Sequence, residues 1–95
     1  MNNNVYNRLK NYIDLSKSLI SEEGFEEVMH FFNHGEFEMA FEGLVIELME
    51  VKKYPIQYEH QEWKGMGLEF KLDKDSVFDG DFWIKFEKWG ETYNN

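Results

Sequence analysis

FEMAFEGLVIELMEV, residues 37–51, is the stretch that decides the fold. Its apolar residues recur three and four positions apart over more than three turns, as they do along one face of an α-helix. They are Phe37, Ala40, Phe41, Leu44, Val45, Leu48 and Met49. A β-strand would need an alternation of period two, which fails at Ala40–Phe41 and again at 44–46. The stretch therefore predicts a helix that begins just after Gly35 and ends at Tyr54–Pro55, because a residue before proline disfavours helical geometry.

This helix is expected to lie at the centre of the molecule. Met39, Gly43 and Ile46 fall outside the main apolar stripe, which predicts burial on two sides. Glu38 and Glu42 are four residues apart, and the pattern places both on the remaining polar side. Reversing both charges is accordingly expected to leave the fold intact.

Two more helices are predicted before it. An amphipathic pattern covers about residues 4–20, and Ser21 is a suitable N-cap for a second helix with Glu22 and Glu23 in its first turn. This second helix is expected to close at 33–35, the sequence Asn-His-Gly.

The segment after Pro55 admits two interpretations. Residues 56–70 fit a helix, although Gly65 and Gly67 each lower its stability by roughly 1 kcal/mol relative to alanine. Alternating apolar residues at 68–72 and 82–86 also fit a C-terminal β-hairpin. We favour helices, the last one capped by Asp79 or Asp81. The predicted fold is thus all-α, a compact bundle of four to five helices in a single domain, 1–95, with an α+β fold as the alternative.

The negative charge is concentrated in one third of the chain. The net charge is −9, and residues 21–51 hold nine glutamates with no lysine or arginine. Such a surface repels nucleic-acid phosphates and anionic membranes and attracts a basic partner. A solvated acidic face that serves solubility is the plainer interpretation.

The composition indicates how the chain forms a core and in which compartment it is expected. Seventeen aromatic residues (nine Phe, five Tyr, three Trp) supply a core for this short chain, and the absence of cysteine fits a reducing compartment. No signal peptide and no stretch of about 20 apolar residues is visible. The sequence predicts a cytoplasmic protein that does not bind a membrane.

No complete catalytic or metal-binding motif is present. The sequence contains no cysteine nucleophile and no glycine-rich phosphate loop, so neither an enzyme nor a small-molecule substrate is expected. Glu27–His30–His34 lacks the partners of a dimetal or zinc site. DKDSVFDGD, residues 73–81, departs from a calcium loop because it lacks the central glycine and the terminal glutamate. We expect no metal and no cofactor.

Two stretches carry a resemblance to a known family. HGEFEMAFEGLVIEL (34–48) and LDKDSVFDGDFW (72–83) resemble the MafI-type immunity proteins of bacterial polymorphic and contact-dependent growth inhibition toxins, over roughly residues 25–90. The resemblance implies an immunity protein that binds and neutralises a cognate toxin C-terminal domain, often a nuclease, in the cytoplasm of the producing cell.

The partner implied by the resemblance suits the charge. A nuclease needs a basic cleft for its substrate, and an acidic surface is steered toward such a cleft. The expected partner contacts are acidic residues: Glu22, Glu23, Glu26, Glu38, Glu42, Asp79 and Asp81. The alternative function is an acidic adaptor or regulatory subunit that binds a basic host protein.

Overall fold

The computed structural model describes residues 3–93, which form five α-helices. They are α1 (Asn3–Ser16), α2 (Glu22–Asn33), α3 (Phe37–Val51), α4 (His60–Glu69) and α5 (Phe82–Tyr93). Residues 3–93 contain no β-strand, so the all-α prediction is confirmed and the C-terminal hairpin is wrong.

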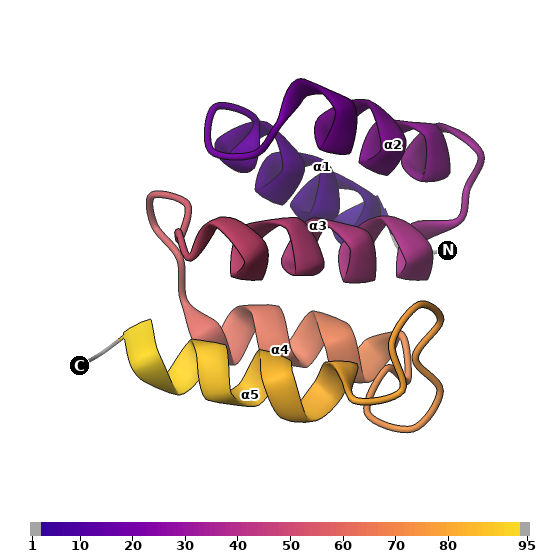
Figure 1. Ribbon diagram of the computed structural model, residues 1–95. Helices are drawn as coiled ribbons and strands as arrows, with labels where there is room; N and C mark the ends of the chain where they lie inside the picture. The colour runs from indigo at the N-terminus through magenta and orange to yellow at the C-terminus, as the bar shows by residue number, and fades with distance from the viewer. Residues whose placement is uncertain (1–2, 94–95) are drawn as a thin grey trace.

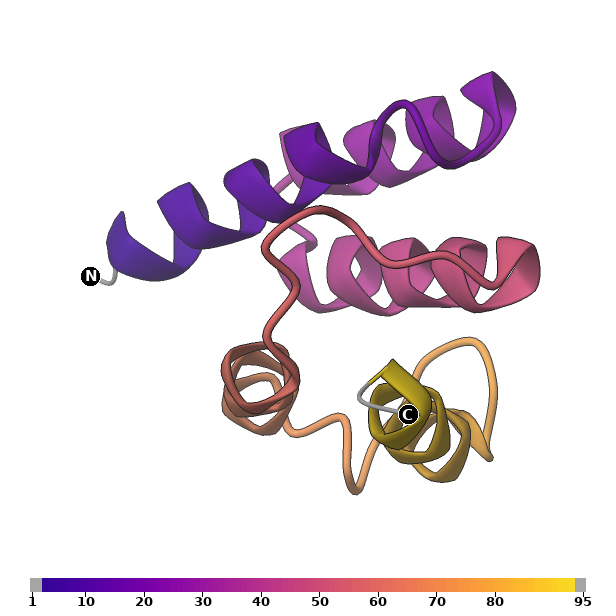
Figure 2. The same ribbon diagram turned by 90° about the vertical axis from the view of Figure 1, so that its left-hand side faces the viewer.

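Helix α3 is the centre of the molecule, as predicted. It lies between the α1–α2 pair and the α4–α5 pair (Figures 1 and 2), and it packs against each of the other four helices. Phe41 is fully buried, and its ring lies 5.9 Å from that of Trp63 and 6.0 Å from that of Phe86, measured between centroids. The core cluster takes buried side chains from all five helices. The apolar stripe of α3 therefore organises both halves of the fold.

The first helix is shorter than predicted, and the second begins where predicted. Helix α1 ends at Ser16, whose hydroxyl donates to the carbonyl of Tyr12 at 2.8 Å; residues 17–20 form a turn instead of continuing the helix. A serine hydroxyl bonded to its own helix backbone weakens the helix there. Ser21 is the N-cap of α2, and its side chain accepts the backbone N–H of Gly24 at 2.9 Å.

The connection between α3 and α4 is longer than predicted. Helix α3 ends at Val51, and Lys52 adopts a left-handed conformation (φ 58°) that closes the helix before Pro55 is reached. Gln57 is also left-handed (φ 66°), so α4 begins at His60 and not at Ile56. Ile56 is consequently 72% exposed and takes no part in the core.

Candidate partner-binding surface

The acidic residues expected to contact a partner do not form one patch. Glu22, Glu23 and Glu26 are exposed on α2, and Glu38 is exposed in the first turn of α3. Helices α2 and α3 run antiparallel, joined by a short turn (Figure 1), so the N-terminal end of α2 lies beside the C-terminal end of α3. Glu38 is at the other end of this hairpin.

Glu42 corrects the prediction most clearly. It was expected beside Glu38 on a polar surface, but its side chain is fully buried. Its carboxylate accepts three backbone N–H groups of the α4–α5 loop (residues 70–81): Val77 at 2.7 Å, Phe78 at 2.8 Å and Asp79 at 3.2 Å. Successive backbone N–H groups form an anion-binding concavity, and here the anion is a side chain of the same protein. Glu42 therefore fixes the loop and has no surface with which to contact a partner.

Of the two loop aspartates expected to contact a partner, Asp79 forms side-chain bonds at the start of α5. Asp79 is half-buried; its carboxylate accepts the backbone N–H of Asp81 at 2.9 Å and the Nζ of Lys85 at 2.8 Å. The Lys85 ammonium and the Asp81 N–H hold the pKa of Asp79 below its usual range. Asp81 is exposed. Asp79 is therefore already paired with a cation, whereas no glutamate of α2 forms an ion pair with another residue of the described range 3–93.

The structure brings together a different acidic set. We call Glu23, Glu27, Glu47 and Glu50 the acidic quartet; the first two lie on α2 and the others on α3. Burial, followed by the charges of Glu50, Glu27 and Glu23, raises the pKa of Glu47. No member of the quartet forms an ion pair with any residue from 3 to 93. The other three carboxylates are therefore near enough to Glu47 to disfavour its charged form.

Only one member of the quartet was among the expected contacts. The sequence predicts Glu23 as a contact, whereas Glu27, Glu47 and Glu50 belong to the same charged segment and are not among the predicted contacts. A signal was available, because Glu23–Glu27 is an i, i+4 pair that places both carboxylates on one face of α2. The pairing of that face with the end of α3 follows only from the hairpin.

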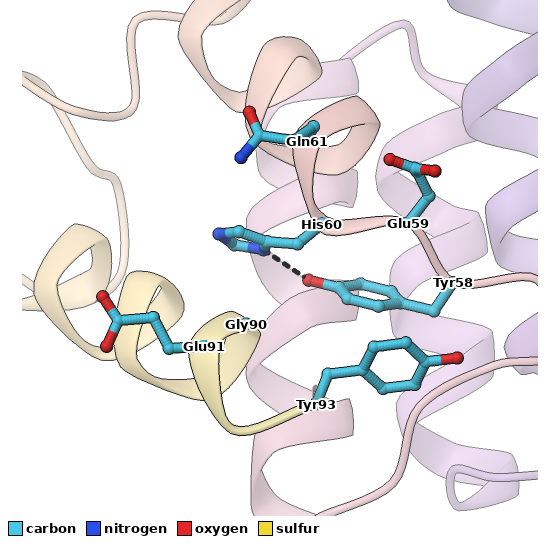
Figure 3. A pocket seen from close by; sticks show the side chains of 7 residues that line it. All are labelled: Tyr58, Glu59, His60, Gln61, Gly90, Glu91 and Tyr93. Carbon is cyan, nitrogen blue, oxygen red and sulfur yellow. Dashed lines mark hydrogen bonds between the residues drawn. The ribbon is translucent and has the colours of Figure 1, made fainter. Parts of the chain in front are cut away.

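A cavity of about 420 Å³ lies where the start of α4 meets the C-terminal end of α5. Tyr58, His60 and Tyr93 contribute to its lining, and Figure 3 shows the Tyr58 hydroxyl directed toward the His60 ring. The hydroxyl lies 2.7 Å from His60 Nδ1, and His60 Nε2 lies 2.9 Å from Glu87 Oε1. Lys64 Nζ completes this chain at 2.8 Å from the second oxygen of Glu87.

This polar chain connects α4 to α5. Burial raises the pKa of the Tyr58 hydroxyl, so the group stays neutral. Burial alone would raise the pKa of Glu87, but the hydrogen bonds from Lys64 and His60 outweigh it and lower that pKa. Both nitrogens of the imidazole are engaged: Nδ1 contacts the Tyr58 hydroxyl in the loop before α4, and Nε2 contacts Glu87 of α5. The arrangement stabilises the packing of the two helices.

The residues of the two incomplete metal motifs in the sequence contact other groups of the protein. Between residues 3 and 93, no three His, Asp or Glu side chains gather as a ligand set. His34 Nδ1 contacts the carbonyl of His30 at 2.7 Å, and the 73–81 segment is organised around Glu42. In the same range, none of the helices has the length and apolar character that crossing a bilayer requires.

Comparison of the chain with family models, curated proteins and solved structures found no match.

Proposed function

We propose that this protein is an immunity protein that binds and neutralises a basic toxin domain, in keeping with the family resemblance of residues 34–48 and 72–83. The observation that carries the proposal is the charge of the α2–α3 hairpin. Residues 21–51 hold nine glutamates and no lysine or arginine, and the acidic quartet has no cationic partner within residues 3–93.

Stability alone does not account for this arrangement. Like charges at neighbouring helical positions destabilise a helix by a few tenths of a kcal/mol per pair, and interspersed lysines would relieve them. Lysines do accompany the acids in residues 52–95, which hold seven of them. A basic partner supplies the missing counter-charge, so the unfavourable repulsion in the free protein becomes attraction in the complex.

The proposed mechanism is occlusion by binding, without chemistry. A nuclease toxin must attract phosphates, and an acidic helical face presents the same sign of charge to the same basic cleft. Charge complementarity can raise association rates to about 10⁸–10⁹ M⁻¹s⁻¹ at low salt. Rapid capture is useful because one uninhibited toxin molecule turns over many substrates. We place this function in the cytoplasm of the cell that makes the toxin.

Co-expression tests the proposal. The protein is produced with the C-terminal domain encoded by the upstream open reading frame, and growth and co-purification are measured. We expect wild type to restore growth and Glu22→Lys with Glu26→Lys to protect less at equal protein level. Asp73→Lys with Asp75→Lys is the matched control, because it changes the net charge equally at exposed positions outside the hairpin. Failure of wild type to protect or to bind the toxin domain would refute the immunity function and favour the adaptor.

A further inference from the structure

An apolar groove lies between α2, α3 and the α4–α5 loop. It encloses about 210 Å³. Apolar side chains from all three elements line it together with Gly43, and Glu27 and Glu47 contribute carboxylates. The apolar wall residues are Val28, Phe31, Ile46 and Phe78. We call this feature the Phe78 groove.

The groove is held in shape by Glu42. Its carboxylate binds the backbone N–H groups of both Val77 and Phe78, which fixes the loop against α3. The Phe78 ring then packs on Phe31 of α2, with 5.6 Å between the ring centroids and 43° between their planes. Phe78 nevertheless remains 47% exposed. Two rings from distant segments thus form one wall that is ordered and still open to a partner.

The charge at the groove has one sign. Glu47 is half-buried, and its carboxylate lies against the backbone of Gly24, where an added Cβ would collide with it. Burial raises the pKa of Glu47, and the carboxylates of Glu50, Glu27 and Glu23 raise it further. An occupant that balances this charge must be cationic, and one that fills the groove must also have an apolar or planar surface.

Arginine combines these properties better than lysine. Its guanidinium is planar, stacks on aromatic faces and donates two parallel hydrogen bonds to a carboxylate, whereas the lysine ammonium is a compact and strongly hydrated charge. Its three-carbon stem can lie along apolar walls while the head reaches the rim. The groove offers aromatic rings and carboxylates at once.

We propose that the Phe78 groove receives an arginine side chain of the protein partner, with the guanidinium against the Phe31–Phe78 wall and paired with Glu27 and Glu47. This inference rests on the proposed function for the identity of the partner. A second copy of this chain is a poorer occupant, because the chain has a single arginine, Arg8, which is half-buried on α1.

Two kinds of variant test the groove without removing its supports. Gly43→Ala places a methyl group 3.8 Å from Val28 Cγ2 and 3.9 Å from Phe78 Cε2, which is ordinary contact, so the fold should be retained while the groove becomes shallower. Gly43→Leu fills it further. Gly65→Ala is the matched control, since Gly65 lies on α4 with no atom within 4 Å of an added Cβ. Glu27→Gln with Glu47→Gln removes the charge at nearly constant shape.

The first measurement uses a peptide probe. The ¹⁵N-labelled protein is titrated with acetyl-Leu-Arg-Leu-amide and with its citrulline counterpart, which has nearly the same shape and no charge. We expect the arginine peptide to shift the amide signals of Gly43, Glu47 and Phe78, and the citrulline peptide to bind at least about tenfold more weakly. Gly43→Ala should weaken binding and Gly65→Ala should not. Equal binding of both peptides, or shifts located elsewhere, would overturn the proposal.

The second measurement uses the toxin domain and separates the two proposals. If wild type protects, the Gln pair and Gly43→Ala should each weaken toxin binding about tenfold or more, with melting temperatures no lower than wild type. Protection with unchanged affinity in these variants would overturn the groove and leave the immunity function standing. Specific binding of the arginine peptide without protection from the toxin would support the groove and refute the immunity function. Concentration-dependent dimerisation that Gly43→Ala abolishes would identify a second copy as the occupant and overturn the arginine assignment.

Discussion

Replacing Glu42 should damage the fold far more than replacing any exposed glutamate of the acidic segment. Its carboxylate accepts backbone N–H groups from Val77, Phe78 and Asp79 in a fully buried position. Hydrogen bonds to charged groups contribute about 1.5–3 kcal/mol each, but the three share one acceptor group and are not additive. Glu42→Ala also empties the space of a buried side chain, which water can partly refill. We therefore expect a loss of about 3–5 kcal/mol in the free energy of unfolding.

A graded series strengthens the test. Glu42→Gln keeps one acceptor oxygen but turns an NH₂ donor toward backbone donors, and we expect a loss of about 1–3 kcal/mol. Glu42→Lys replaces the acceptor with a cation and should destabilise most. Glu38→Ala is the control, because Glu38 is exposed in the first turn of the same helix and its charge contributes about 0.3–1 kcal/mol through the helix dipole.

Urea unfolding followed by circular dichroism measures the series, and amide hydrogen exchange locates the effect. Exchange should accelerate first at Val77 and Phe78 in Glu42→Gln, whose fold is expected to persist. If the free energies of unfolding of Glu42→Ala and Glu38→Ala differ by less than about 0.5 kcal/mol, the Glu42 carboxylate does not hold the loop. The same outcome would remove the argument that the Phe78 groove is preformed.

Three further predictions follow from the core, the metal candidates and the α4–α5 contact. Phe41→Ala should lower the free energy of unfolding by about 2–5 kcal/mol in a urea titration, since a fully buried ring is lost from between two layers. A chelator should leave the melting temperature unchanged; a drop that calcium or zinc restores would contradict this. Because its folded-state pKa is lowered, Glu87 stabilises the fold above the ordinary glutamate pKa and loses this contribution as pH falls through the lowered value. Glu87→Gln should therefore flatten the acid limb of stability against pH, and an unchanged limb would contradict the assignment.

The local sequence pattern was sufficient to predict the central helix, α3, and the N-cap of α2. The apolar stripe from Phe37 is continuous and helical in period, and Ser21 accepts the N–H that an N-cap residue is expected to accept. Both features depend on residues within four positions of one another. Interactions of this range can be derived from sequence because the helix itself sets the geometry.

Glu42 was misplaced because its partners are 35 to 37 residues away along the chain. Helical periodicity assigns a face by residue type, and it classes every glutamate as solvated. A loop with three free N–H donors is invisible to that criterion, since backbone groups are the same in every sequence. The buried face of α3 is accordingly wider than its apolar residues indicate.

Glycine weakened the helix prediction in the C-terminal half, although that prediction is confirmed. Gly67 counted against a helix at 56–70, yet it lies within α4, and an added Cβ would come within 2.7 Å of the Trp83 ring. The local cost of glycine is therefore offset by close packing of α5 on α4. Helix propensity includes the local cost of glycine but not the packing of α5 on α4. The sequence therefore leaves a hairpin open as an alternative.

The acidic segment thus divides into two kinds of glutamate, and the division bears on what the segment does. Glu42 is satisfied inside the protein by three backbone donors, so its charge is accounted for by the fold. Glu47 is half-buried, and burial together with the neighbouring like charges raises its pKa, so at neutral pH its ionised form opposes folding. A surface that served solubility alone would gain nothing from placing a carboxylate there, because exposed positions would serve equally without that opposition. Glu47→Gln should consequently raise the melting temperature at neutral pH while weakening toxin binding. A variant that loses stability, or that gains it and binds as tightly as wild type, would show that this carboxylate is not reserved for a partner.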